Sequence, residues 1–135
     1  MKFSDKPKRD VTVIFKRFLA VLAIFAGSVQ AEEPRIDSSK AAFHVGSTAM
    51  VCGVVSEVKN FSKGVYLNMG PTYPNQHVSV LIWADDVAGF DTRFGGLSVF
   101  GGKRVCARGL IEVYRNSLQI KVSNPQFLRL MQSVK

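Results

Sequence analysis

The sequence His77-Val-Ser-Val-Leu-Ile-Trp83 runs directly into Ala84-Asp-Asp-Val-Ala-Gly-Phe-Asp-Thr-Arg-Phe94, and the spacing of the apolar residues changes at the junction. The first stretch is rich in valine, leucine and isoleucine, which favours a β-strand. In the second stretch Val87, Phe90 and Phe94 recur at helical spacing. Two glycines follow Phe94 and are typical of a helix end. The junction therefore predicts a strand that is followed immediately by a helix.

Short strand-like runs flank this strand and helix on both sides. Ser47–Val58 and Val65–Met69 precede them, and Val105–Tyr114 and Leu118–Val122 follow them. The first run is long enough to pair with two neighbours. The order of three strands, one helix and two strands predicts an all-β fold class. We expect a five-stranded Greek-key barrel of the oligonucleotide/oligosaccharide-binding (OB) type, with one helix between strands three and four.

Gly53 and Gly109 lie inside the first and fourth predicted strands, where a glycine normally weakens the strand. A small barrel must bend its strands sharply, and a residue without a side chain permits such a bend. We therefore interpret these glycines as bend positions of a barrel.

Several segments resemble those of a known group of proteins, the small bacterial OB-fold domains of the nucleic-acid-binding, anticodon-binding-like branch. The resemblance covers the chain from about His44 to Leu130. Some members of this group stand alone behind a signal peptide, and others are attached to exported nucleases. The resemblance implies the OB fold and makes nucleic acid the expected ligand. It is carried by Val51–Val55, Tyr66–Gly70, Tyr73–Gln76, Gly102–Gly109 and Tyr114–Ile120.

The N-terminus has the organisation of a secretory signal peptide. A basic region, Lys2–Arg17, precedes the uncharged apolar run Phe18–Ala26, and small residues stand at Val29 and Ala31. Signal peptidase recognises this pattern, so we expect Met1–Ala31 to be removed and the rest to be periplasmic or secreted. The apolar run is shorter than the roughly 20 residues of a spanning helix, so no stable membrane span is expected after cleavage. An uncleaved amphipathic anchor and a cytoplasmic N-terminus are the alternatives.

The formal net charge of +8 is divided between the leader and the rest of the chain. Met1–Ala31 contains six basic and two acidic residues, a net +4, which leaves +4 for the remainder. A mildly basic domain favours an anionic partner, and an ordinary solvated surface explains the same charge equally well. Residues 32–43 are polar and short of core residues. We therefore expect a flexible lead-in with one helical turn, followed by an OB-fold domain over residues 44–135.

Two cysteines remain outside the leader, Cys52 and Cys106, and each lies in a strand-like run. Period 2 places each cysteine on the strand face opposite its apolar neighbours. If the two strands are adjacent and turn their apolar faces inward, both thiols lie on the same outer side. A disulfide is then possible, and an oxidising compartment would allow it to persist. Two unpaired thiols are the alternative.

The OB fold usually binds its ligands on strands two and three, between the loops that join strands one to two and four to five. Here those loops are Lys59–Lys63 and Arg115–Ser117, and both supply basic side chains. Alternation also leaves ring, amide and basic side chains on the outer faces of strands two and five. The candidate ligand-binding residues are Lys59, Phe61, Lys63, Tyr66, Asn68, Arg115 and Lys121.

Rings and cations at one mouth of a barrel are the chemistry that binds single-stranded nucleic acid, because rings stack on bases and cations neutralise phosphates. A glycan would use the same rings with more amides, and a protein partner could use the same face. Taken singly, each candidate is also an ordinary surface or half-buried side chain. Only their convergence indicates a site.

Patterns typical of catalysis and cofactor binding are missing from the sequence. It contains no closely spaced metal-ligating cysteines or histidines, no phosphate loop and no Gly-x-Ser-x-Gly. The paired arginines and carboxylates of the nucleases that use this fold are not found either. We therefore expect no metal, no cofactor and no enzymatic activity. The expected function is a non-catalytic exported binding module for single-stranded nucleic acid, and the alternative is an envelope-associated module that binds a protein or a glycan.

Overall fold

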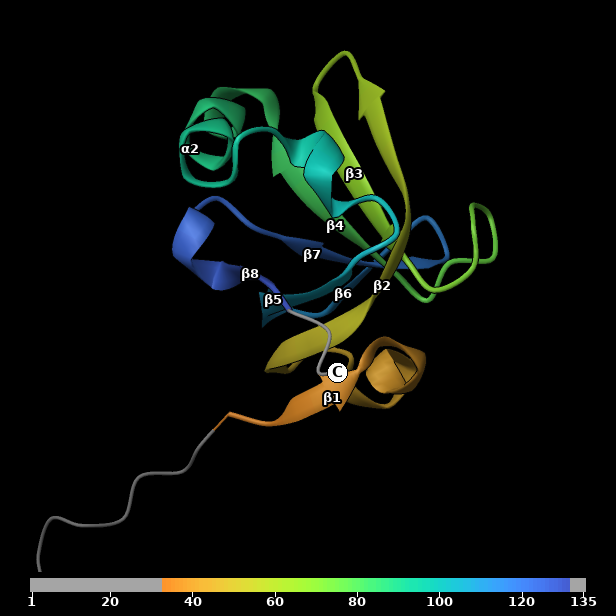
Figure 1. Ribbon diagram of the computed structural model, residues 1–135. Coiled ribbons are helices and arrows are strands. Elements are labelled where there is room, and N and C mark those ends of the chain that lie inside the picture. The colour runs from red at the N-terminus through yellow and green to blue at the C-terminus, as the bar shows by residue number, and fades with distance from the viewer. Residues whose placement is uncertain (1–32, 132–135) are drawn as a thin grey trace, which may run out of the picture. The chain divides into compact units, whose positions relative to one another are not determined.

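A computed structural model describes residues 33–131 of the chain. The predicted signal peptide, residues 1–31, lies outside this part. The described chain forms a strongly curved β-sheet, and one α-helix lies at one end of it (Figure 1). Within the described residues, no helix is both long and apolar enough to cross a membrane.

The secondary structure of residues 33–131 consists of short strands around one long strand, one α-helix and three 3-10 helices. The α-helix has the bounds that the sequence predicts, and Gly95 ends it in the left-handed conformation with φ 82°. In chain order the elements are β1 (Arg35–Asp37), η1 (Ser38–His44), β2 (Thr48–Phe61), β3 (Gly64–Met69), β4 (Val78–Trp83), α2 (Ala84–Phe94), η2 (Leu97–Phe100), β5 (Arg104–Leu110), β6 (Glu112–Tyr114), β7 (Ser117–Lys121), η3 (Pro125–Phe127) and β8 (Leu128–Leu130).

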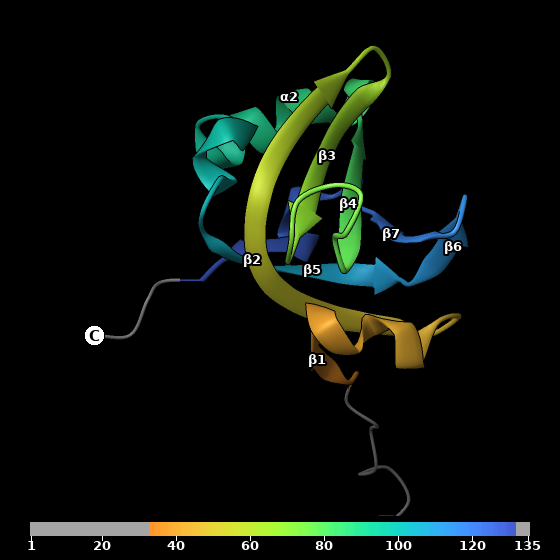
Figure 2. The same ribbon diagram turned by 90° about the vertical axis from the view of Figure 1, so that its right-hand side faces the viewer.

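The long strand β2 is shared between two groups of strands. Its residues 48–54 pair antiparallel with β5, and its residues 55–61 pair antiparallel with β3. The register shifts between Val55 and Glu57, which marks a β-bulge at the handover. Figure 2 shows β2 as one continuous curved strand that reaches from β1 to the far end of β3. The prediction that the first strand serves two neighbours is confirmed.

The hydrogen-bonded sheet has eight strands in the order β6-β7-β4-β3-β2-β5-β8, with β1 beside β2. The predicted all-β class, with a helix after the third predicted strand, is confirmed, whereas the sheet has eight strands instead of the predicted five and does not close into a barrel. The predicted fourth strand is broken at Ile111 into β5, which pairs with β2, and β6, which pairs with β7. The break occurs because the Ile111 N–H donates to Ser47 O at 3.0 Å and its carbonyl accepts from Gly46 N at 2.8 Å. Ile111 is therefore the single residue that connects β5 to β6.

The core lies on the concave side of the sheet and is closed by the helix. The side chains that alternation turns inward from the predicted second and third strands are all buried. From α2 and η2, Phe90 and Phe100 are fully buried in the same core. Burial of these apolar side chains is the dominant favourable contribution to folding. The inward residues of β3 and β4, each at most 5% exposed, are Val65, Leu67, Met69, Val78, Val80 and Ile82.

Residues 35–44 lie largely in the segment for which the sequence predicts a flexible lead-in with one helical turn. They form β1, which pairs in parallel with β2, and the 3-10 helix η1. The Asp37 side chain caps η1 by accepting a hydrogen bond from Ser39 N at 3.1 Å. Ala41 of η1 is fully buried. Backbone pairing to β2 and the Asp37 cap help to hold this segment, and a hydrophobicity pattern shows neither contact.

Close packing explains the glycines inside the strands. A Cβ atom on Gly53 would lie 2.5 Å from Ser38 Oγ, and a Cβ atom on Gly109 would lie 2.7 Å from Ile120 Cγ2. Both distances are far inside van der Waals contact. Because glycine has no side chain, η1 can approach β2 at Gly53 and β7 can approach β5 at Gly109. This close packing is a reason for the glycines beyond the bends that the sequence predicts.

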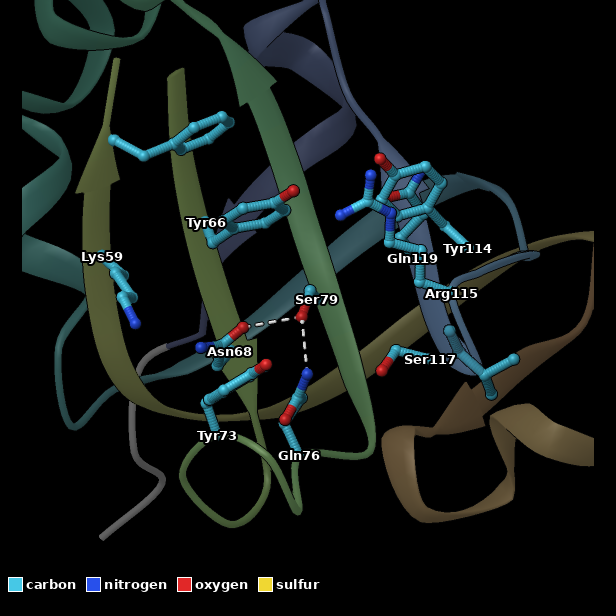
Figure 3. A pocket seen from close by; sticks show the side chains of 12 residues that line it. Lys59, Tyr66, Asn68, Tyr73, Gln76, Ser79, Tyr114, Arg115, Ser117 and Gln119 are labelled. Atoms are coloured by element: carbon cyan, nitrogen blue, oxygen red, sulfur yellow. Dashed lines mark hydrogen bonds between the residues drawn. The ribbon is translucent and has the colours of Figure 1, made fainter. Parts of the chain in front are cut away.

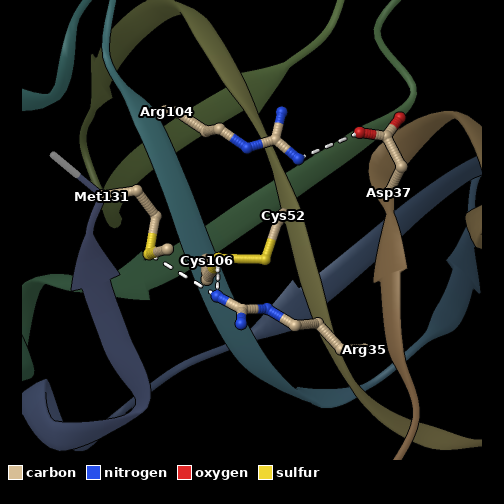
Figure 4. Close-up of a disulfide and its surroundings, with 6 residues drawn as sticks. All are labelled: Arg35, Asp37, Cys52, Arg104, Cys106 and Met131. Atoms are coloured by element: carbon tan, nitrogen blue, oxygen red, sulfur yellow. Dashed lines mark hydrogen bonds and ion pairs between the residues drawn. A yellow bond between two sulfur atoms is a disulfide. The ribbon is translucent and has the colours of Figure 1, made fainter. Parts of the chain in front are cut away.

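Cys52 and Cys106 face each other across β2 and β5 and form a disulfide, as the sequence predicts (Figure 4). The two residues are only 4% and 1% exposed, so the bridge does not lie on an open outer surface. Arg35 of β1 covers it, because its Nη2 lies 3.7 Å from Cys106 Sγ and 3.7 Å from Met131 Sδ. The bridge is therefore enclosed between β1, β2, β5 and the chain after β8.

The first prediction concerns the contact between Gly53 and η1. Gly53→Ala is expected to lower the free energy of unfolding by about 1–3 kcal/mol, because the new methyl group overlaps Ser38 in a packed site. Gly101→Ala is the matched control, since its Cβ would have only ordinary contacts from 3.6 Å outward. The control should change stability by less than about 1 kcal/mol. Equal stability of both variants in urea unfolding would contradict the close approach of η1.

A second prediction concerns the disulfide. The double variant Cys52→Ala/Cys106→Ala is expected to lose about 2–4 kcal/mol of unfolding free energy, because the bridge joins residues 54 positions apart. Guanidinium unfolding at constant pH measures the loss. The reduced wild-type chain should unfold at nearly the midpoint of the double variant. A wild-type midpoint that does not respond to reduction would show that the bridge adds no stability.

Candidate functional site

An open pocket of about 320 Å³ lies on the outer face of the sheet (Figure 3). Its walls come from the second half of β2, from β3, β4, β6 and β7, and from the turns that connect these strands. We call it the aromatic pocket. Its lining residues are Lys59, Phe61, Tyr66, Asn68, Tyr73, Gln76, Ser79, Tyr114, Arg115, Ser117, Leu118 and Gln119.

A row of polar side chains crosses the sheet beneath the aromatic pocket. Because neighbouring strands are in register, one residue from each strand falls in the same cross-strand row. We call it the amide row, and its members are Glu57, Asn68, Ser79, Gln119 and Glu112.

Hydrogen bonds hold the amide row in place. Ser79 Oγ donates to Asn68 Oδ1 at 2.6 Å, and Asn68 Nδ2 donates to Glu57 Oε1 at 2.8 Å. At the other end Gln119 Nε2 donates to Glu112 Oε1 at 3.0 Å. The three central residues are at most 6% exposed, and buried polar groups need such partners. The floor of the pocket is therefore a fixed polar surface.

Gln76 adds an acceptor to this floor. Its Nε2 donates to Ser79 Oγ at 3.3 Å (Figure 3). Its Oε1 is buried, and among the described residues it has no hydrogen-bond partner. A buried acceptor without a partner costs free energy, so a ligand that donates a hydrogen bond here would remove that cost.

Aromatic rings and cations form the rim above the amide row. Phe61 and Tyr66 stack with their centroids 4.7 Å apart and their planes 13° from parallel. On the β3–β4 side, Lys59 Nζ lies 5.1 Å from the centroid of the Tyr73 ring. The Tyr73 side is open to solvent, since this residue is 61% exposed. Planar surfaces and positive charge thus meet around a hollow.

A second ring and cation stand on the opposite side of the aromatic pocket. Arg115 Cζ lies 5.3 Å from the centroid of the Tyr114 ring. Arg115 and Asn116 form the tight turn between β6 and β7 with φ values of 49° and 64°. Positive φ at both central residues is the signature of a type I′ hairpin turn. This turn fixes where the Arg115 side chain leaves the backbone.

Glu57 connects the amide row to the loop between β3 and β4. Its Oε1 accepts from Tyr73 N at 2.8 Å as well as from the Asn68 amide. The Tyr73 amide first, and the Asn68 side chain second, hold the pKa of Glu57 below its usual value. The carboxylate is therefore ionised at neutral pH and anchors the loop that carries Tyr73.

Of the residues that the sequence singles out, Lys59, Phe61, Tyr66, Asn68 and Arg115 line the aromatic pocket together. The other two, Lys63 and Lys121, are exposed and are not among its lining residues. Lys121 Nζ lies 3.3 Å from Glu112 Oε1, so an ion pair directs this side chain. Lys63 lies in the turn between β2 and β3, where its carbonyl accepts from Ala84 N at 2.8 Å.

The remaining lining residues were not in the predicted set. Alternation does place Ser79 and Gln119 on the outer face, and this signal could have included them. Tyr73 and Gln76 lie in a segment that composition marks only as a turn, and no periodicity shows where a turn residue points. The full set of missed residues is Tyr73, Gln76, Ser79, Tyr114, Ser117, Leu118 and Gln119.

The arrangement can bind a planar, hydrogen-bonding and anionic ligand. Rings offer stacking surfaces, the amide row offers donors and acceptors, and the cations on both sides offer positive charge. Within residues 33–131 no group of three or more histidine, cysteine, aspartate or glutamate side chains is placed to hold a metal ion.

Comparison with known proteins finds similar solved structures but no relative in sequence. No protein-family model matches the chain, and no curated protein matches it in sequence. Among solved structures, an OBody bound to hen egg-white lysozyme is similar over 78% of this chain and 100% of its own, with a TM-score of 0.53 and 16% identity. A second lysozyme-bound OBody is similar over 79% of this chain and 100% of its own, with a TM-score of 0.50 and 14% identity.

A third similar structure is the Stn1–Ten1 complex of S. pombe. The likeness covers 64% of this chain and 59% of that chain, with a TM-score of 0.48 and 15% identity. At such low identity these likenesses concern the fold alone. Together with the strand order and the single α-helix of the described residues, the OBody structures support an OB-type fold for this chain.

Proposed function

We propose that the protein is a non-catalytic binding module for single-stranded nucleic acid and that the aromatic pocket is its binding site. The observation that carries the proposal is the combination of stacked Phe61 and Tyr66 rings with Lys59 and Arg115 around one hollow. Single-stranded nucleic acid presents flat bases and a charged backbone in alternation, and this rim offers a surface for each. The proposed ligand-binding residues are Lys59, Phe61, Tyr66, Asn68 and Arg115, with Tyr73 and Tyr114 as additional rings.

The energetics of such a site are dominated by two terms. Each base that stacks on an exposed ring contributes about 1–3 kcal/mol. Each cation that neutralises a phosphate releases a counterion, so affinity falls as salt rises. The buried Asn68 amide adds hydrogen bonds without an ordering cost, because its orientation is already fixed.

A glycan or a protein partner is the second candidate function. The observation that favours it is the amide row, since sugars and peptides are also bound by rings and amides together. An OBody, which shares this fold, is bound to a protein in its structure. Binding of that kind depends weakly on salt, whereas nucleic-acid binding depends on it strongly.

We also propose that the domain is exported. The enclosed disulfide between Cys52 and Cys106 supports this, because such bonds persist in oxidising compartments. Signal peptidase would remove Met1–Ala31, and the periplasm or the extracellular medium would be the site of action.

The third prediction tests the binding site with the full chain and fluorescent oligo(dT) at low and moderate salt. We expect micromolar binding that weakens steeply with salt. Tyr66→Ala should bind about tenfold or more weakly, because a stacking surface is lost. Lys59→Gln should lower the slope of log affinity against log salt by about one, because one phosphate contact is lost.

Lys63→Gln is the matched control for Lys59→Gln. It removes one positive charge from the same hairpin but lies outside the lining of the aromatic pocket. If both lysine variants bind alike, net charge rather than the pocket explains the binding. If the folded wild-type chain binds no oligonucleotide at low salt, the nucleic-acid proposal is wrong and the glycan or protein candidate takes its place.

The fourth prediction concerns export. When the full coding sequence is expressed in a bacterial host, the periplasmic or secreted product should have the mass of a chain that begins at Glu32, since cleavage is expected after Ala31. Intact-mass spectrometry of that fraction measures it. Ala31→Leu should accumulate as the uncleaved chain, because the peptidase requires a small residue there. Recovery of full-length wild-type protein in the cytoplasm would contradict export.

A further inference from the structure

A second hollow lies on the outer surface of the sheet, apart from the aromatic pocket. It measures about 440 Å³ and shares no lining residue with the aromatic pocket. Arginine is the commonest residue type in its lining, and no acidic residue belongs to it. We call it the arginine groove, and its lining residues are Met50, Arg93, Arg108, Gln126, Phe127 and Arg129.

Elements that are distant in the sequence bring the three arginines together. Arg93 stands in the last turn of α2, Arg108 on β5 and Arg129 on β8. Strands β5 and β8 are paired, and Arg129 lies directly opposite Cys106. The disulfide from Cys106 to β2 therefore fixes the backbone on which Arg108 and Arg129 stand.

Aromatic rings support two of the guanidinium groups. Arg108 Cζ lies 4.9 Å from the centroid of the Phe127 ring, and Arg93 Cζ lies 5.6 Å from the centroid of the Phe94 ring. Stacking uses the flat face of a guanidinium and leaves the N–H groups at its edge for other partners. The rings thus orient the arginines without consuming their hydrogen bonds.

The Glu33 carboxylate already forms an ion pair with one of these arginines, Arg108. Arg108 Nε and Nη2 each donate to a Glu33 carboxylate oxygen at 2.6 Å, which is a bidentate pair. This hydrogen-bonded pair also holds the pKa of Glu33 below its usual value, so the carboxylate is ionised. Arg93 and Arg129 form no ion pair within residues 33–131. Within the described part of the chain, the groove thus holds more positive charge than carboxylates neutralise.

We propose that the arginine groove is a second binding site, for a chain of phosphate groups, in which Arg93, Arg108 and Arg129 contact phosphate oxygens and Glu33 competes for Arg108. The planar guanidinium fork matches phosphate oxygens two at a time. A single carboxylate can pair with only one guanidinium. Three guanidinium groups around one groove match an anion that carries several charged groups. A nucleic-acid backbone and inorganic polyphosphate share this chemistry.

Isothermal titration calorimetry of the full chain with inorganic tripolyphosphate at low salt tests the proposal. Tripolyphosphate has no bases, so it cannot stack on the rings of the aromatic pocket, and only the cations of that pocket need a control. Arg129→Gln and Arg93→Gln should each bind about fivefold or more weakly, because each loses a charged hydrogen-bonding partner. Glu33→Gln should bind about threefold more tightly, because it frees the fork of Arg108.

Two control variants separate the groove from general charge and from the aromatic pocket. Lys40→Gln removes one exposed positive charge outside the arginine groove, and Lys59→Gln removes a cation of the aromatic pocket. Both should bind tripolyphosphate like the wild type. The proposal is overturned if the folded wild type does not bind, if Lys40→Gln loses as much affinity as Arg129→Gln, or if Glu33→Gln shows no gain.

A second titration distinguishes the two sources of phosphate. An oligomer of abasic deoxyribose phosphate presents the phosphodiester backbone alone. If Arg129→Gln weakens binding of tripolyphosphate but not of this oligomer, the occupant is inorganic polyphosphate rather than a nucleic-acid backbone. If it weakens both probes, the groove accepts any chain of phosphates. If it weakens neither probe, the site does not exist.

Discussion

Strand β2 is paired along its whole length but exchanges its partner from β5 to β3 at Val55. Its first half carries Met50 of the arginine groove and the disulfide partner Cys52, and its second half carries Lys59 of the aromatic pocket. The bulge between Val55 and Glu57 separates the two halves and lets the strand turn. Both candidate surfaces therefore depend on one strand, and a shift of its register would displace both together.

The aromatic pocket divides its tasks between a rigid floor and a solvent-exposed rim. The three central residues of the amide row are buried and each is hydrogen-bonded within the row, whereas Tyr73 and Tyr114 are 61% and 48% exposed. A ligand therefore meets hydrogen-bonding groups that need no reorganisation and rings that remain accessible. Glu57 connects the two parts, because the same carboxylate oxygen accepts from Asn68 in the floor and from the Tyr73 backbone in the rim. Loss of this carboxylate would remove one hydrogen bond from the Asn68 side chain and one from the Tyr73 backbone.

Period and composition predicted the parts of the fold that depend on local sequence. Alternation assigned the inward faces of β3 and β4, and helical spacing gave α2 with its observed bounds. The break at Ile111 could not be predicted, because it depends on backbone hydrogen bonds to Gly46 and Ser47, which are more than sixty residues away in the chain. Docking of β1 and η1 was missed for a similar reason, since their stability comes from pairing with β2 and from the space above Gly53.

Register explains what sequence could not show about the site. Alternation alone places Asn68 and Gln119 on outer faces, but only the pairing of β3, β4 and β7 places them in one row. The same limit applies to charge. A sum over the sequence counts Lys59 and Lys121 equally, yet the fold pairs Lys121 with Glu112 and leaves Lys59 beside the Tyr73 ring.

Within the described residues, the cations without a carboxylate partner include two that line the aromatic pocket and two that line the arginine groove, namely Lys59, Arg115, Arg93 and Arg129. The modest net charge of the domain therefore understates its attraction for anions. Ion pairs cancel charge where they form, and positive charge is left in hollows where a ligand can be held by several groups at once. In this protein, the place where an anionic partner can bind depends on which cations lack a carboxylate partner, and not on the total number of cations.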